Sequence, residues 1–596
     1  MAWSAMHFLL PKKSDCPNSN IFLFIMKLKI SSSWVRFIPL FISGLLILPA
    51  RAQQADVIYI NGNVITGQSI GHRAEAIAIK AGKIVGVGSN QQKAAWQGPS
   101  TKVIDLKGKT VVPGFNDAHL HPSPKYPFES VHTSLDLGPA VVKNNQELIA
   151  LLKKKAAITP EGLPIRGFSY QDTKLGGHPT RHILDQASTR HPIIIRHSSG
   201  HISAVNSYVL NLAGITKDTP DPPGGSFDRD PDGTPNGVCR ESALSEFFRS
   251  KKLKEPAPAS EKEEMEAYRK TFDEYLSNGI TSVTEAGSSF PKMELYRKLQ
   301  AAGLALRINL LISESHLDEV IKKGVKQGDG NEYLRISGIK VFHGNSLSGR
   351  TCWLNEPYDK INPETGKKDY YGIPPKRSQQ QLDSLFLKIH ANGLQIGCHS
   401  NGDREIEMVL TALERMQQQK PKINSRHRIE HCSIVTPSIL NRIKNDSVVI
   451  VLHSYIYEHG DKMIEYGPNR WDWMFPNRKA IDMGISVAQH SDSPISAAIP
   501  LLRIQSLATR TSAEGIVIGE KQKISPEEAI RLWTYGGAYA SFEEKQKGTI
   551  EAGKWADLVV LSEDPTQTAA TKIKDISVLQ TIVGGKVVFE KNKQKH

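Results

Sequence analysis

The sequence VVPGFNDAHLHP at residues 111–122 joins an apolar run to two histidines that are separated by one residue. We predict a strand over 111–118, because side chains alternate along a strand and His119 and His121 would then point the same way. Two imidazoles on one face at a strand end supply half of a metal site. By itself the pair also fits two surface histidines beside a turn, so the rest of the chain has to decide.

Apolar strand-like runs alternate with amphipathic stretches through the middle of the chain, a pattern typical of parallel α/β folds. Helices are expected over 262–278 and 379–392, among others. We predict a (β/α)8 barrel, in which active groups lie at the C-terminal strand ends. The eight expected strands are 111–118, 280–286, 306–312, 336–342, 394–398, 427–431, 447–452 and 485–489.

The segment after the first expected strand is too long for a single crossover connection and contains strand-like runs of its own. We therefore interpret 122–261 as an inserted domain that caps the barrel mouth, with the barrel at 111–121 and 262–540. Short strands separated by glycine turns fill both chain ends. We expect 53–110 and 541–596 to form one small β-sandwich, since neither end has enough apolar surface to stand alone.

Residues 1–52 resemble a secretory signal peptide, with lysines at 27 and 29, an apolar run at 37–48 and the cleavage pattern Ala50-Arg51-Ala52. Residues 1–25 fit a leader poorly, so we interpret them as an over-extended start before Met26. Export to a periplasm is expected, and the apolar run is too short to remain as a membrane span.

Charge and cysteine content exclude some classes of protein. The formal charge is +14, of which 1–52 contributes +5, which leaves +9 spread over 544 residues without a basic block. Nucleic acid is therefore not expected as a partner. The chain has five cysteines and no Cys-x-x-Cys pair, so a disulfide framework is not expected either.

Metal-ligand side chains stand at the ends of several expected strands and would converge on one opening of the barrel. Imidazole with carboxylate suits Zn²⁺ or a similar divalent ion, as one ion or two. A lysine fits such a site as a carbamate that bridges two ions, and otherwise it is an ordinary lysine at a strand end. The candidates are His119 and His121 (first strand), Lys340 (fourth), His399 (fifth), His431 (sixth) and Asp492 (eighth).

Substrate contacts are harder to assign from sequence. His201 in the insertion is a candidate for reaching the substrate from above, or else it makes a structural hydrogen bond. Arg350 and Arg240 are weaker candidates for binding an acidic group, with solvated arginines as the alternative.

Several short motifs along the chain match those of a known family. They are His119-Leu120-His121, Cys398-His399, Glu430-His431, Ser491-Asp492, Gly200-His201, Asn401-Gly402-Asp403 and 339–342. With these motifs the chain resembles the amidohydrolase superfamily, and in particular its family 3 branch, which includes N-substituted formamide deformylase. The resemblance covers about residues 55–590. One position departs from the branch pattern: His343-Gly344-Asn345 stands where Ala-Asp-Gly is usual, which bears on specificity.

The resemblance implies a metal-activated water that attacks a non-peptide amide, formamide or cyclic amide. Asp492 would take the proton of that water and pass it to the leaving nitrogen, with a purely structural ligand as the alternative. His431 or His399 would help to polarise the substrate carbonyl from a second ion. Two alternatives stay open: a deaminase or other hydrolase built on the same site, and a non-catalytic regulatory protein with this fold. The expected partner is a small molecule, and the sequence leaves a homo-oligomer open.

Overall fold

The computed structural model describes residues 54–243, 253–362 and 365–591. The expected leader, including the start at Met26, lies outside these residues. Within the part of the chain that is described, no helix is both long enough and apolar enough to cross a bilayer. Cys239, Cys352, Cys398 and Cys432 are all free and buried.

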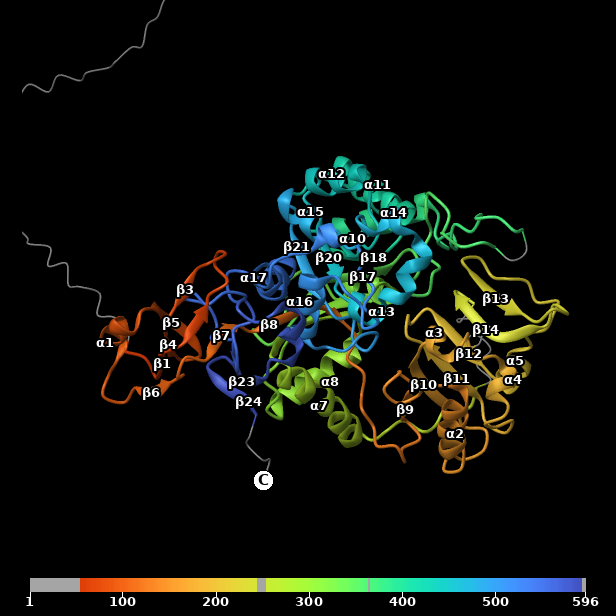
Figure 1. Cartoon of the computed structure of the whole chain (residues 1–596), viewed down its shortest axis with the longest axis horizontal. Helices are drawn as coiled ribbons and strands as arrows, with labels where there is room; N and C mark the ends of the chain where they lie inside the picture. The colour runs from red at the N-terminus through yellow and green to blue at the C-terminus, as the bar shows by residue number, and fades with distance from the viewer. Residues whose placement is uncertain (1–53, 244–252, 363–364, 592–596) are drawn as a thin grey trace, which may run out of the picture. The chain divides into compact units, whose positions relative to one another are not determined.

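An eight-stranded parallel sheet forms the centre of the molecule (Figure 1), and its strands follow one another in chain order. The sheet is nearly closed, because backbone hydrogen bonds join the end of its first strand to the loop after its last strand. Asp492 N donates to His119 O at 3.0 Å, and His121 N donates to Ser493 O at 2.7 Å. The strands are β8 (Phe115–Leu120), β15 (Ile280–Ser288), β16 (Arg307–Ser313), β17 (Leu334–Phe342), β18 (Gln395–Ser400), β19 (Arg428–His431), β20 (Val449–His453) and β21 (Val487–His490).

Amphipathic helices lie between the strands and bury their apolar sides in the largest hydrophobic cluster, as a barrel requires. Local signals in the sequence explain where they start. Helix α7 (Glu261–Ser277) begins at a capping box, in which Ser260 N donates to Glu263 Oε2 at 2.9 Å. Helix α10 (Gln379–Ala391) begins with the same device at Ser378.

The single strand predicted over 111–118 is divided in the structure. Strand β7 (Thr110–Pro113) pairs with the C-terminal strand β22 (Leu558–Leu561), and only β8 belongs to the barrel. Gly114 lies between them, where a Cβ atom would come within 2.1 Å of Thr281 Oγ1. Glycine therefore lets the chain pass close to β15 as it changes from one sheet to the other.

The two chain ends contribute to a shared six-stranded sheet, ordered β24-β23-β22-β7-β2-β3. A separate four-stranded sheet is ordered β5-β4-β1-β6, and residues of both sheets meet in one hydrophobic cluster. A two-sheet sandwich, as a domain, stays a prediction. The remaining strands are β1 (Val57–Ile60), β2 (Asn63–Ile65), β3 (Arg73–Ala74), β4 (Ala76–Lys80), β5 (Lys83–Gly88), β6 (Lys102–Asp105), β23 (Val578–Val583) and β24 (Lys586–Glu590).

Between β8 and α7 the chain forms another six-stranded sheet with a hydrophobic cluster of its own. Its strands lie beside one another in Figure 1, ordered β13-β14-β12-β11-β10-β9. We refer to this segment as the insertion; its role as a cap stays a prediction. Its strands are β9 (Ser134–Asp136), β10 (Ile165–Tyr170), β11 (Ile193–His197), β12 (Ile202–Val205), β13 (Gly225–Arg229) and β14 (Pro235–Glu241).

Candidate metal centre

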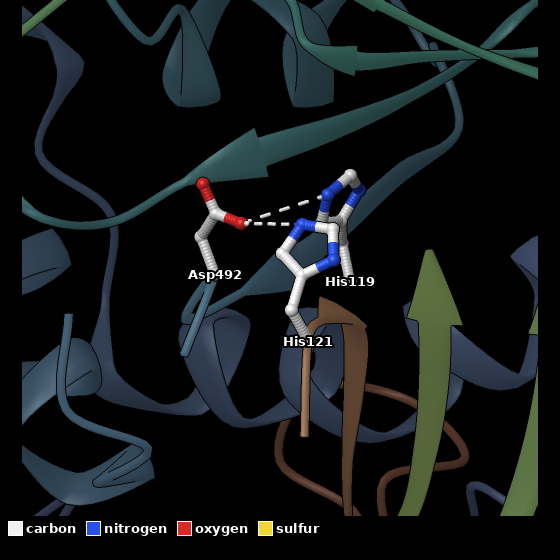
Figure 2. A group of neighbouring side chains, drawn as sticks. All are labelled: His119, His121 and Asp492. Carbon is white, nitrogen blue, oxygen red and sulfur yellow. Dashed lines mark ion pairs between the residues drawn. The ribbon is translucent and has the colours of Figure 1, made fainter. Parts of the chain in front are cut away.

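Three side chains converge where the first and last barrel strands meet (Figure 2). His119 is in β8, His121 follows it, and Asp492 follows β21. Asp492 Oδ1 lies 3.4 Å from His121 Nε2 and 3.6 Å from His119 Nε2. Edges of a tetrahedron around Zn²⁺ with ordinary bond lengths measure about 3.3 Å. These three donors therefore fit a small divalent ion in both chemistry and spacing.

The proton of His119 is held on the side away from the other donors. His119 Nδ1 donates to Glu430 Oε2 at 2.5 Å, and Arg428 donates to both oxygens of the same carboxylate. Burial lowers the pKa of His119 well below its usual value, so the ring is neutral at physiological pH. In this tautomer the proton is on Nδ1 and the lone pair is on Nε2, which can therefore bind an ion.

Glu430 and Arg428 were not predicted as site residues, although Glu430 appears in a matching motif. Both side chains are completely buried. A sequence signal for them exists, because residues two apart in a strand share a face. Two opposite charges on one face of a strand whose four residues are all buried indicate a buried polar function rather than a solvated surface.

A second group of donors shares Asp492 with the first. Ligand atoms of His431, His490 and Asp492 all lie within 4.8 Å of one another. His490 was not predicted; it is buried, and within the described part of the chain neither of its ring nitrogens has a hydrogen-bond partner. Buried polar atoms of this kind are typical of positions that bind an ion or an ordered water.

The backbone at these strand ends is held in an unusual conformation. His431 has φ +73° and Asp492 has φ +59°, in the left-handed region that disfavours side chains other than glycine. Such positions cost on the order of 1–3 kcal/mol and concentrate at functional sites. The backbone conformation therefore marks both strand ends as candidate functional positions.

Lys340 and His399 complete the predicted set. Lys340 Nζ donates to His119 Nε2 at 3.3 Å, and burial lowers the pKa of Lys340 to about 8. His399 Nε2 lies 3.2 Å from the backbone oxygen of Asn345, which leaves Nδ1 free to act as a ligand. The His399 and His431 rings are 4.6 Å apart. The structure thus brings all six predicted donors together; their individual roles as ligands remain predictions.

The donors face a cavity of about 940 Å³ whose walls come from both the barrel and the insertion. His201 lines it, with its ring 5.0 Å from that of His399 and its Nδ1 donating to Glu241 Oε2 at 2.7 Å. His343, the departure from the branch pattern, also lines the wall. Burial lowers the pKa of His343 to about 4, so it faces the cavity as a neutral ring.

The two arginines considered for substrate binding are already occupied. Arg350 donates to Asp172 and lies 3.5 Å from Glu465. Arg240 forms a two-bond pair with Asp228 at 2.6 and 2.7 Å. The structure places neither side chain among the residues that line the cavity.

Comparison with known proteins agrees with this geometry. The chain is 28% identical to putative amidohydrolase YtcJ of Bacillus subtilis over 90% of its length and 99% of that protein. It is 27% identical to N-substituted formamide deformylase of Arthrobacter pascens, with the same coverage. A solved structure of an uncharacterized metal-dependent hydrolase from Pyrococcus furiosus matches with a TM-score of 0.63 and 26% identity, over 86% of this chain and all of that one. The model of the amidohydrolase family matches residues 102–589, and the chain therefore belongs to this family of hydrolases that act on carbon–nitrogen bonds.

Proposed function

We propose that the protein hydrolyses a non-peptide amide, a formamide or a cyclic amide, with water activated at the site formed by His119, His121 and Asp492. The observation that carries the proposal is the spacing of these three donors, 3.4 and 3.6 Å about one carboxylate oxygen. Zn²⁺ suits this mixture of imidazole and carboxylate best. Lys340, His399 and His431 would hold a second ion, with Lys340 as its carbamate.

A bound ion of this kind would lower the pKa of a coordinated water to about 7 and polarise the substrate carbonyl. The residues of the chain would move the proton. Asp492 is the carboxylate that both donor groups share, and its Oδ1 has no hydrogen-bond partner among the residues that the structure describes. It would accept the proton and return it to the leaving nitrogen. His201 would contact the substrate from the insertion side, oriented by Glu241.

The proposed kind of bond is supported by similarity to known proteins as well as by geometry. Similarity to an N-substituted formamide deformylase supports formamides and other open amides as the first substrates to test. A deaminase would use the same donors, because the residues that line the cavity decide which substrate and leaving group are accepted. A non-catalytic protein has no reason to keep six converging donors, which argues against a purely regulatory role.

Location is proposed on the sequence alone. The features of residues 1–52 support export to a periplasm, where the mature chain would act on a small molecule without a stable membrane span. Cell fractionation tests export, because protein found in the cytosol with residues 27–52 intact would contradict it. Sequencing the N-terminus tests the start site, because a mature chain that begins before Met26 would contradict a start at that residue.

The activity is tested by screening N-formyl amines, N-acyl amines and cyclic amides against protein loaded with Zn²⁺. His121→Ala should lose both bound metal and at least about 1,000-fold in kcat/KM, equivalent to about 4 kcal/mol of transition-state stabilisation. His316→Ala is the matched control, because His316 is partly exposed and outside the cavity lining. Full activity and retained metal in His121→Ala would refute the site. Release of ammonia from heterocyclic amines, without amide hydrolysis, would favour the deaminase.

A further inference from the structure

The cavity is larger than the metal donors and a formamide group require. Its volume of about 940 Å³ lies at the upper end of the range for sites that hold drug-sized ligands. A substrate that fills it must extend from the metal donors along the insertion wall. The charges on that wall therefore bear on the substrate class.

The acidic side chains of the lining are all engaged. Glu241 accepts from His201 at 2.7 Å, and Glu314 pairs with Arg377 at 3.0 Å. Asp492 belongs to the metal donors. Two cations of the lining, Arg196 and Lys376, have no ion-pair or hydrogen-bond partner within residues 54–243, 253–362 and 365–591.

Strand alternation explains why Arg196 faces the cavity. Along β11, Ile193, Ile195 and His197 are buried, while Arg196 lies on the opposite face and is exposed. The surrounding wall still removes part of its hydration, which lowers the pKa of Arg196 below its usual value. An arginine remains charged under these conditions, so the wall carries an uncompensated guanidinium.

Lys376 approaches the same cavity from the barrel side, in the loop before α10. The loop packs closely against the insertion, because a Cβ atom on Gly224 would lie only 2.9 Å from Lys376 Cβ. Gly224 lines the cavity as well. The two free cations are thus contributed by the two different walls of one cavity.

We infer that this cavity takes an amide whose far end carries an anionic group, a carboxylate or a phosphate, which Arg196 binds with support from Lys376. The inference rests on the proposed function and adds the substrate class to it. A guanidinium matches either anion through two parallel N–H···O bonds. Such a contact places the amide at the metal donors by holding the opposite end of the molecule. Arg350 and Arg240 cannot serve in this way, because Asp172 and Asp228 already occupy them.

Matched substrates test the inference. N-formyl-β-alanine, N-formyl-O-phosphoethanolamine and neutral N-formylpropylamine share the reacting group and differ at the far end. The zinc-loaded wild type should prefer at least one of the two anions over the neutral compound by tenfold or more in kcat/KM, mainly through KM. Arg196→Gln should abolish that preference, and Arg196→Lys should keep part of it. Arg190→Gln is the control, because Arg190 is an exposed insertion arginine that pairs with Glu161 outside the cavity lining.

The result separates the anion site from the reaction itself. If none of the three compounds is hydrolysed, the proposed function fails on these substrates. Calorimetric titration of the same compounds still tests the anion site. The inference is supported if the wild type binds an anionic compound at least tenfold more tightly than the neutral one and Arg196→Gln loses this difference. Equal binding of charged and neutral compounds would overturn the inference. A preference that survives in full in Arg196→Gln would also overturn it, because a group other than Arg196 would then hold the anion.

Discussion

At the scale of single residues, the donor geometry around His119 depends on a carboxylate that is not itself placed as a ligand. Glu430 fixes the His119 proton on Nδ1, and Arg428 fixes Glu430 in turn. Neither side chain has any contact with solvent, so the orientation of the imidazole is set before an ion arrives.

We expect Glu430→Gln to weaken zinc binding by about 10–100-fold, because outer-shell partners of metal histidines have effects of this size. The neutral amide no longer compensates Arg428 and holds the His119 tautomer less firmly. Affinity is measured by competition with a chelating dye, with circular dichroism as the check on folding. Glu544→Gln, at a carboxylate that pairs with Arg426 instead, should leave the affinity unchanged. Wild-type affinity in Glu430→Gln would contradict this account.

His490 supplies a second prediction at this scale. Both of its ring nitrogens are buried without partners beside His431 and Asp492. We expect His490→Phe to reduce zinc affinity by tenfold or more, about 1.4 kcal/mol, because it removes a nitrogen donor while keeping the ring. His453→Phe is the control: His453 is a buried neighbour that lies outside the donor groups. Equal metal affinity in the two variants would show that His490 is only a packing residue.

At the scale of elements, buried histidines join adjacent parts of the barrel. His427, at the start of β19, accepts a hydrogen bond from Ile396 N of β18 on Nδ1. Its Nε2 lies 2.9 Å from His390 Nδ1, and His390 Nε2 donates to Lys420 O at 2.8 Å. This chain of bonds needs neutral rings, and burial, followed by His390, lowers the pKa of His427 to about 3.

The pH dependence of stability follows from that shift. A histidine whose pKa is lower in the folded state takes up a proton only on unfolding between about pH 3 and 6.5, so stability falls as pH falls through this window. We expect His427→Gln to flatten this loss by up to about 1.4 kcal/mol per pH unit. Thermal unfolding between pH 7 and pH 4 measures this loss of stability. The difference in stability between the two proteins at pH 7 corrects for altered packing in the variant. Parallel curves for the two proteins would contradict the prediction.

At the scale of the whole molecule, a buried ion pair joins the C-terminal segment to the barrel. Arg307 of β16 donates to both oxygens of Asp557 at 2.7 and 3.0 Å, and Gly584 N donates to the same carboxylate. The backbone oxygen of Asp557 also accepts a hydrogen bond from Gly114 N, just before the first barrel strand. Through its side chain and its backbone, this one residue connects the C-terminal segment with the third barrel strand and with the start of the first.

We expect Asp557→Asn to destabilise the protein by about 3–5 kcal/mol, because it leaves Arg307 buried without a counter-charge. Replacing both residues by apolar ones of similar size should cost less than the single change. Glu274→Gln breaks the exposed pair with Lys125 and should cost less than about 1 kcal/mol. Urea denaturation measures all three variants. A double variant less stable than Asp557→Asn would show that the ion pair itself is the main source of stability.

Much of the architecture could be predicted from sequence because it depends on local pattern. Eight apolar runs correspond to the eight barrel strands, and His119, His121, Lys340, His399, His431 and Asp492 meet where those strands end. Alternation along a strand and the common direction of parallel strands require no knowledge of partners. The division at Gly114 was missed, because it reflects how close Thr281 lies in space and leaves no trace in hydrophobicity.

The identity of partners across the fold was decided only by the tertiary structure. Glu430 orients His119, 311 positions away along the chain, and Asp172 neutralises Arg350, 178 positions away. No local pattern shows which arginine is neutralised. The sequence therefore favours Arg350 and Arg240, whereas the cavity is lined by Arg196, which has no ion-pair partner among the described residues. The sequence alone determined which residue types stand at the strand ends. Packing of distant segments determined which of their charges remain free, because a charge is compensated by whatever lies nearest to it in space.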